Sequence, residues 1–151
     1  MLDVNQPFPE FELADQNGVA HSKASLLGSP TVVFFYPKDD TSGCTVEACG
    51  FRDALPQFVG AKMVGVSPDG VKSHAKFATK FNLPYTLLAD TEKALCESVG
   101  VWVEKSMYGR KYMGVERTTF LLDAEGVVRR VWRKVKPEGH AEDVLAALDG
   151  V

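Results

Sequence analysis

The sequence is short of several features that would point to particular classes of protein. It has three cysteines in 151 residues, and no two of them form the C-x-x-C pair of thioredoxin-type redox sites. Its longest apolar run, Thr31–Tyr36, is far shorter than the roughly 18 residues that a membrane-spanning helix needs. The opening residues, MLDVNQPFPEF, contain neither the basic start nor the apolar core of a secretory signal. We therefore expect a cytoplasmic protein that does not associate with membranes.

Positive charge is also scarce. The chain has 17 Lys and Arg against 20 Asp and Glu, a net charge of -3, and no basic run that could follow a phosphate backbone. Nucleic acid is therefore not expected as a partner. Hydrophobic residues make up 45% of the chain and charged residues 25%, which is typical of an ordinary globular domain. We expect residues 1–151 to form a single domain that needs no disulfide or metal to build its core, so any chemistry of its cysteines is expected to be functional.

The hydrophobic pattern predicts strands and helices that alternate through the first half of the chain. Buried strands are predicted at Thr31–Tyr36, Ala61–Val66 and Thr86–Leu88, and an antiparallel pair at Thr118–Leu122 and Val127–Trp132. Helices are predicted at Ser42–Leu55, Val71–Phe81 and His140–Leu148, and from a Thr91 cap to Val99.

Two further segments complete the pattern. Phe11–Leu13 and Val19–Ser22 flank Asn17-Gly18, which predicts an N-terminal β-hairpin, and Val101–Tyr112 is compatible with an irregular excursion or an edge hairpin. The order predicts an α/β three-layer sandwich with a mixed sheet and Thr31–Tyr36 as a central strand.

The chemistry concentrates in the segment PKDDTSGCTVEAC, residues 37–49. Cys44 falls in the first turn of the predicted helix, where unpaired backbone N–H groups and the positive end of the helix dipole stabilise a thiolate. This position favours a reactive nucleophile. The alternative is a buried structural cysteine.

Cys49 lies five residues after Cys44 on the same predicted helix. Helix geometry then separates the two Cα atoms by roughly 8.7 Å, whereas a disulfide needs about 4.4–6.8 Å. The pair can therefore join only if part of the helix unwinds. Gly50 lowers helix stability by about 1 kcal/mol relative to alanine and would ease unwinding, although close packing would also explain a glycine there.

A C-x4-C pair can also form half of a zinc site. The three histidines, His21, His74 and His140, are scattered along the sequence, and no second ligand pair accompanies the cysteines. We therefore expect no metal.

The segment FFYPKDDTSGCTVEACGFRD, residues 34–53, resembles the active-site segment of the peroxiredoxins, in particular the bacterioferritin comigratory protein or peroxiredoxin Q subfamily. The family motif P-x-x-x-T-x-x-C matches Pro37, Thr41 and Cys44, and the resolving position of the subfamily matches Cys49. Further similarity extends through VNQPFPEFEL, LLAD and GVWVEKSMYGRKYMGVERTTFLLD, and so covers nearly the whole chain. Ser42 departs from the subfamily, which often has proline at this position.

The resemblance implies a thioredoxin-like fold with an added N-terminal hairpin and a thiol peroxidase that needs no cofactor. Cys44 would attack hydrogen peroxide or an organic hydroperoxide, and Pro37 would shield its thiolate. Thr41 would bind the peroxide through its hydroxyl, although it is also suited to capping the helix. Arg117 resembles the family's active-site arginine, although without the resemblance it would be read as a solvated charge. Glu47 matches an acidic position of the family and is expected to act only indirectly.

The resemblance also implies how the enzyme is recycled. Cys49 would attack the sulfenic acid on Cys44 to form an intramolecular disulfide, which thioredoxin or a similar dithiol protein would reduce. The subfamily favours a monomer. Cys96 is expected to be a buried apolar residue of a helix, and a role as an alternative resolving thiol stays open.

Two other classes of function use the same residues differently. A thiol–disulfide oxidoreductase acting on proteins would use Cys44 and Cys49 without peroxide, although that role favours C-x-x-C at a helix start. A thioredoxin-like binding module would leave the cysteines incidental, which their joint presence with Thr41 and Arg117 disfavours. Loss of thiols on mixing with peroxide, followed by thioredoxin-dependent turnover, would distinguish a peroxidase from both.

Overall fold

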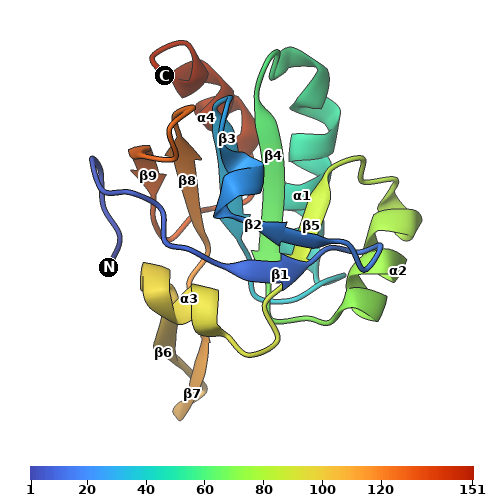
Figure 1. Cartoon of the computed structure of the whole chain (residues 1–151). Helices are drawn as coiled ribbons and strands as arrows, with labels where there is room; N and C mark the ends of the chain where they lie inside the picture. The colour runs from blue at the N-terminus through green and yellow to red at the C-terminus, as the bar shows by residue number, and fades with distance from the viewer.

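A five-stranded mixed sheet forms the centre of the computed structural model, which describes residues 1–151 (Figure 1). Its strands lie in the order β5-β4-β3-β8-β9. They are β3 (Thr31–Phe35), β4 (Lys62–Ser67), β5 (Thr86–Ala89), β8 (Thr118–Leu122) and β9 (Val128–Trp132). β3, β4 and β5 are parallel, whereas β8 and β9 each run antiparallel to their neighbour. The predicted mixed sheet is confirmed, with β3 at its centre.

Helices and an N-terminal segment cover the two faces of this sheet. Helices α1 (Ser42–Ala54), α2 (Val71–Phe81) and α4 (His140–Leu148) pack on one face, and α1 lies beside α4. Helix α3 (Ala94–Val99) and the N-terminal segment around Phe8 cover the other. The three-layer prediction is therefore confirmed, and the predicted helix ends agree with the structure to about one residue except at the start of α3.

Strand β3 divides the core in two because its side chains alternate between the faces. All five residues are buried; Val32 and Phe34 join the cluster that contains Cys44. Val33 and Phe35 join the cluster that contains Cys96. The central sheet therefore separates Cys44 from Cys96.

The predicted N-terminal hairpin is present as β1 (Glu12–Ala14) and β2 (Ala20–Ser22), followed by a short 3-10 helix η1 (Lys23–Leu26). In its loop only Gly18, and not Asn17, has positive φ, at 79°. A second 3-10 helix, η2 (Leu55–Gln57), ends α1, where Pro56 cannot continue the α-helical hydrogen bonds.

The start of α3 differs from the prediction. Thr91 does not cap the helix, which begins at Ala94 after Lys93. The buried carboxylate of Asp90 instead accepts hydrogen bonds from the backbone N–H groups of Leu95 and Cys96. A carboxylate that is already buried at the end of β5 can satisfy these groups, so the threonine is not needed. Gly100 ends the helix with a φ of 84°, as predicted.

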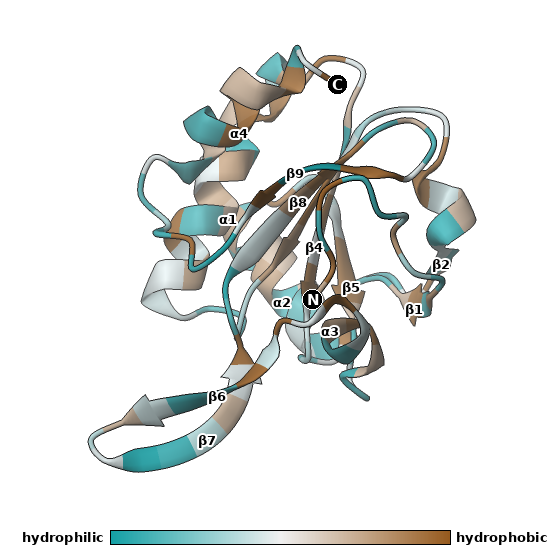
Figure 2. Ribbon diagram, turned by 90° about the vertical axis from the view of Figure 1, so that its left-hand side faces the viewer, coloured by the Kyte–Doolittle hydropathy of each residue, from teal (hydrophilic) through white to brown (hydrophobic).

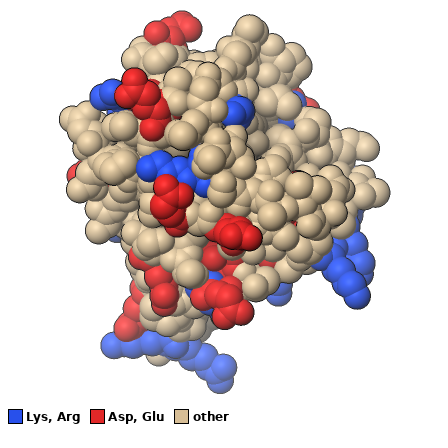
Figure 3. Space-filling view, in the orientation of Figure 1, with Lys and Arg blue, Asp and Glu red and all other residues tan.

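The segment Val101–Tyr112, for which the sequence allowed an irregular excursion or an edge hairpin, is part of a hairpin that projects from the body of the molecule (Figure 2). Strands β6 (Trp102–Met107) and β7 (Arg110–Val115) pair only with each other and make a separate two-stranded sheet. Tyr108 and Gly109 turn between them with φ values of 51° and 78°, the pattern of a tight hairpin turn. Basic side chains gather at this end of the molecule (Figure 3), where Arg110 and Lys111 are exposed.

No helix in the chain has both the length and the apolar character required to cross a membrane.

Candidate functional site

Cys44 lies at the start of α1, just beyond the carboxyl end of β3. The chain leaves β3 at Phe35, passes through the loop 36–41 and enters α1 at Ser42. The predicted position of Cys44 in the first helical turn is therefore confirmed. Its side chain is only 2% exposed, and the thiol is not in a disulfide. A sulfur here lies near the unpaired N–H groups and the positive dipole end of the helix, which stabilise negative charge.

Arg117 contacts Cys44 across 73 positions of sequence. Its Nη2 donates to Cys44 Sγ over 3.2 Å, and its Nη1 donates to Glu47 Oε1 over 2.9 Å. Sheet pairing explains this approach. Phe35, the last residue of β3, is paired with Thr118, so the neighbouring Arg117 is brought to the edge of the sheet where α1 begins. A fixed cation thus lies against the sulfur, as the family resemblance predicts.

Gly43 leaves room for this arginine, and the sequence alone did not identify its role. A Cβ at position 43 would lie 3.2 Å from Arg117 Nη2 and 3.5 Å from Pro137 Cγ. The first of these contacts is tighter than most Cβ atoms make. A side chain at 43 would therefore displace the guanidinium that contacts Cys44.

Thr41 and Pro37 are the other two motif residues, and both lie in the loop before α1. Thr41 occupies the N-cap position, but its hydroxyl does not cap the helix. It donates instead to the carbonyl of Lys38 over 2.9 Å, which leaves the hydroxyl oxygen able to accept a hydrogen bond. Pro37 is half-buried directly after the buried Tyr36. The prediction that the Thr41 side chain also caps the helix is therefore wrong, although the residue does occupy the N-cap position.

Glu47 and His140 form a buried polar pair next to the Arg117–Cys44 contact. Glu47 Oε2 lies 4.0 Å from His140 Nε2 and has no hydrogen-bond partner. Burial raises the pKa of Glu47 to about 7, although the Arg117 charge acts in the opposite direction. Burial also lowers the pKa of His140 to about 4, so its ring is neutral at neutral pH. His140 Nε2 shares a 2.8 Å hydrogen bond with Thr119 Oγ1 and forms no ion pair with Glu47.

Replacing Glu47 by glutamine should remove a pH-dependent loss of stability. The pKa of Glu47 lies at about 7 in the folded protein, above its ordinary value of 4.5, so the folded state keeps a proton that the unfolded chain has released between these values. Stability therefore falls as pH rises through this window, by roughly 3 kcal/mol at about 1.4 kcal/mol per pKa unit. Urea unfolding of the reduced proteins near pH 5 and near pH 7.5 should show Glu47→Gln gaining stability relative to the parent at the higher pH.

Two comparisons isolate the effect of Glu47. The lowered pKa of His140 makes stability rise with pH up to about its ordinary value of 6.5 in both proteins, so this contribution cancels from the difference. Glu142→Gln, on the exposed surface of α4, is the same substitution at a solvent-exposed carboxyl and should give no comparable gain in stability at the higher pH. If Glu47→Gln differed from the parent in free energy of unfolding by the same amount at both pH values, the raised pKa of Glu47 would be contradicted.

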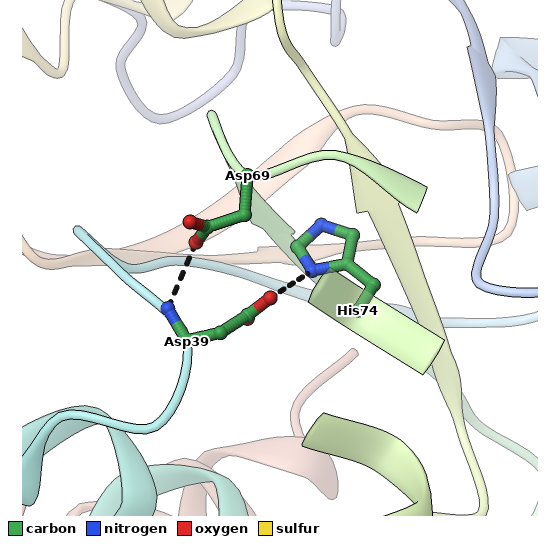
Figure 4. A group of neighbouring side chains, drawn as sticks. All are labelled: Asp39, Asp69 and His74. Atoms are coloured by element: carbon green, nitrogen blue, oxygen red, sulfur yellow. Dashed lines mark hydrogen bonds and ion pairs between the residues drawn. The ribbon is translucent and has the colours of Figure 1, made fainter. Parts of the chain in front are cut away.

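A second buried network fixes the loop that carries Thr41 (Figure 4). Asp39 Oδ2 lies 2.7 Å from His74 Nδ1, and the backbone N–H of Asp39 donates to Asp69 Oδ2 over 2.8 Å. Tyr36 and Ser73 each donate a hydroxyl to the Asp39 carboxylate. His74 thus ties α2 to the loop before Cys44, a contact that the sequence did not predict.

Proton positions follow from the partners of His74. Its Nε2 lies 2.9 Å from the carbonyl of Leu88, which can only accept, so Nε2 carries a hydrogen. Nδ1 shares a further proton with the Asp39 carboxylate, because two lone pairs would repel at that distance. One ligand atom each from Asp39, Asp69 and His74 lie within 4.8 Å of one another, so the fold gathers groups that are scattered in the sequence. Both ring nitrogens of His74 are nevertheless occupied by hydrogen bonds.

The other two cysteines occupy different environments. Cys49 is half-buried on α1 and carries a free thiol. Cys96 is fully buried on the opposite face of the sheet, and burial together with Asp90 raises the pKa of its thiol well above the ordinary range. The expected buried position of Cys96 is confirmed, and the intervening sheet makes it a poor partner for Cys44.

Comparison with known proteins gives consistent matches over the whole fold. Residues 4–131 match the AhpC/TSA family model. The chain is 48% identical to the putative peroxiredoxin bcp of Coxiella burnetii over 149 residues, covering 97% of this chain and 99% of that protein. It is 44% identical to peroxiredoxin Bcp of Bacillus subtilis over 149 residues, covering 97% and 95%.

Solved structures agree with these sequence matches. The bacterioferritin comigratory protein of Xanthomonas campestris, described for its alkyl peroxide reduction activity, superimposes with a TM-score of 0.91 at 43% identity, covering 98% of both chains. A cysteine-to-serine mutant of Xylella fastidiosa PrxQ gives a TM-score of 0.94 at 33% identity, covering 99% of this chain and 97% of the other.

Proposed function

This chain belongs to the AhpC/TSA family as a peroxiredoxin of the Bcp and peroxiredoxin Q type, and from that premise we propose which residues perform its thiol peroxidase reaction. Its fold is the thioredoxin-like fold of these peroxiredoxins. The contact of 3.2 Å between Arg117 Nη2 and Cys44 Sγ, at the start of α1, carries the proposal. It joins a nucleophile and a fixed cation in a site that is nearly closed to water.

Cys44 performs the first chemical step. Its thiolate attacks the terminal oxygen of the hydroperoxide, an S–O bond forms, and the O–O bond breaks. The sulfur becomes a sulfenic acid, and the other oxygen leaves as an alkoxide or hydroxide that takes a proton from water. Sulfur supplies both electrons, so the reaction requires no cofactor.

Arg117, Thr41 and Pro37 prepare this step. The guanidinium of Arg117 neutralises the thiolate and then the negative charge that develops on the leaving oxygen. The hydroxyl of Thr41 accepts a hydrogen bond from the peroxide, since its own hydrogen is already donated to Lys38. Pro37 shields the sulfur side of the loop and presents no N–H group to solvent. Glu47 acts through Arg117, whose second nitrogen it holds.

Cys49 performs the second step. Its thiol attacks the sulfenic sulfur of Cys44, a disulfide forms within the chain, and water leaves. The reduced structure keeps both residues on one helix, so residues between them must leave the helical conformation first. Thioredoxin or a similar dithiol protein then reduces this disulfide and returns both thiols.

The proposal also covers the substrates, the cellular location and the oligomeric state of the protein. We assign hydrogen peroxide and organic hydroperoxides as substrates, supported by the alkyl peroxide reduction described for the X. campestris relative. The acidic charge balance and the absence of a basic run argue against nucleic acid as a partner. We further propose a cytoplasmic location away from membranes and, from the resemblance to the subfamily, a monomer. We also propose that residues 1–151 act as one domain.

The pairing of cysteines tests this mechanism. Reduced protein is treated with one equivalent of hydrogen peroxide, free thiols are blocked, and proteolytic peptides are analysed by mass spectrometry. We expect a Cys44–Cys49 linkage with Cys96 blocked as a free thiol. A Cys44–Cys96 linkage, or a disulfide between two chains, would show that Cys49 is not the resolving residue.

A further inference from the structure

We propose that a hydrogen bond from the Tyr85 hydroxyl to the backbone of α1, called the clasp below, opposes opening of this helix and so sets how readily Cys49 reaches Cys44. Gly50 is the hinge at which the helix opens. This inference rests on the proposed role of Cys49 as the resolving residue. It makes Tyr85 a positioning residue for the second chemical step, because its side chain acts on the backbone beside Cys49 and not on the peroxide.

The clasp is a single short hydrogen bond. Tyr85 Oη donates to the carbonyl of Ala48 over 2.6 Å in a buried environment. Ala48 is the residue immediately before Cys49, so its carbonyl belongs to the stretch of chain that a Cys44–Cys49 disulfide would close into a ring. Burial also raises the pKa of Tyr85 well above its ordinary value, which keeps the hydroxyl protonated as a donor.

Tyr85 is itself held firmly. Its carbonyl accepts a hydrogen bond from Gln16 Nε2 over 2.8 Å, and its ring packs edge-on against Phe34 of the central strand at 5.7 Å. The phenol is therefore held by contacts outside α1, at the residue immediately before β5. Opening the helix at Ala48 must break the hydrogen bond.

The far side of the hinge is anchored. Arg52 Nη1 donates to the carbonyl of Phe81, the last residue of α2, over 2.7 Å. Such terminal carbonyls have no partner within their own helix, so the contact joins the end of α2 to the second half of α1. The chain between Ala48 and Arg52 is thus held at both ends, and Gly50 lies between them.

Packing does not require a glycine at position 50. A Cβ there would meet only the Cβ of Ala141, at 3.8 Å, which is an ordinary contact. Gly50 nevertheless lies inside a helix, where it costs stability relative to alanine. The close-packing explanation of Gly50 is therefore not supported, and the explanation that it eases local unwinding is favoured.

The Tyr85 hydrogen bond favours the closed helix and Gly50 favours the open one, and this balance decides between two fates of the sulfenic acid on Cys44. After the first step, the sulfenic acid is either attacked by Cys49, which releases water, or attacks a second peroxide, which yields a sulfinic acid and an alcohol or water. The first route requires the helix to open, whereas the second proceeds on the closed helix. The equilibrium between closed and open α1 thus sets the peroxide concentration at which half of the protein becomes sulfinic acid.

The test measures that concentration in variants expected to shift the equilibrium in opposite directions. Tyr85→Phe keeps the ring and removes the hydroxyl, and should raise the half-inactivating peroxide concentration about fivefold, as expected for loss of one hydrogen bond. Gly50→Ala should lower it about fivefold, from the difference in helix propensity. Intact-mass spectrometry after mixing with increasing hydrogen peroxide distinguishes the disulfide from the sulfinic acid.

Matched controls separate the clasp from general stability. Thr31→Val removes another buried hydroxyl that donates to a backbone carbonyl, that of Leu26, at the amino end of β3, the opposite end of this strand from Cys44. Thr79→Ala increases helix propensity on the exposed face of α2. Both should shift the melting temperature and leave the half-inactivating concentration at the parent value.

The outcomes distinguish this inference from the mechanism on which it rests. A parent protein that forms no Cys44–Cys49 disulfide would contradict the proposed function itself. A parent that forms the disulfide, with Tyr85→Phe and Gly50→Ala unchanged from it or shifted in the same direction, would overturn the clasp alone.

Discussion

Replacing Cys44 by serine should lower the rate of peroxide consumption to almost the uncatalysed level, a loss of about a thousandfold or more. Serine is not ionised near neutral pH and is a far poorer nucleophile toward oxygen than a thiolate. The hydroxyl can still accept the hydrogen bond of Arg117, so the fold and the surrounding contacts should survive. Peroxide consumption by the reduced protein, with dithiothreitol as reductant, measures the loss.

The control for this variant is its own stability. Cys44 is 2% exposed, and its replacement keeps a small side chain that can occupy the same place. Circular dichroism and thermal unfolding should therefore stay close to the parent. A folded Cys44→Ser protein that still consumed peroxide at a substantial fraction of the parent rate would place the nucleophile elsewhere and contradict the mechanism.

The order of strands and helices could be predicted from local patterns because each pattern has one dominant physical cause. The run Thr31–Tyr36 is apolar on both faces, which fits only a strand covered on both sides. Pro56 limits α1, and Gly100 ends α3 in a conformation that glycine adopts at little cost. In these cases the local chain determines the structure without reference to distant residues.

The start of α3 and the contacts of the site depend on residues far apart in sequence. Asp90 caps α3 because β5 buries its carboxylate there, and no local signal at Thr91 reveals this competition. Arg117 reaches Cys44 only because β3 pairs with β8. Motif similarity predicted that contact, whereas hydrophobic periodicity could not.

Some residues of the site carry no sequence signal at all. Gly43 matters because of a guanidinium that arrives from another strand, and an isolated glycine near a helix start is common. His140 opens the last helix and gave no indication that its ring would lie beside Glu47. His74 and Asp39 are 35 positions apart, and their shared proton follows only from the atoms that surround them. Each depends on packing between elements, which one sequence does not specify locally.

Replacing Cys49 by serine should separate the two chemical steps. The first step needs only Cys44 and its neighbours, so a single equivalent of peroxide should be consumed at nearly the parent rate. Without a resolving thiol the sulfenic acid then persists, and steady-state turnover with thioredoxin should fall about a hundredfold or more. A burst of peroxide consumption followed by very slow turnover is the expected time course.

The matched control is Cys96→Ser, which removes a thiol of the same size from the opposite face of the sheet. Because Cys96 is fully buried and separated from Cys44 by the sheet, this variant should keep the turnover of the parent and lose only some stability. Trapping with a dimedone-type reagent should label Cys44 in Cys49→Ser after one equivalent of peroxide, and excess peroxide should convert it to sulfinic acid. Full thioredoxin-dependent turnover by Cys49→Ser would show that Cys49 is not the resolving residue, and loss of turnover in a folded Cys96→Ser protein as well would assign resolution to Cys96.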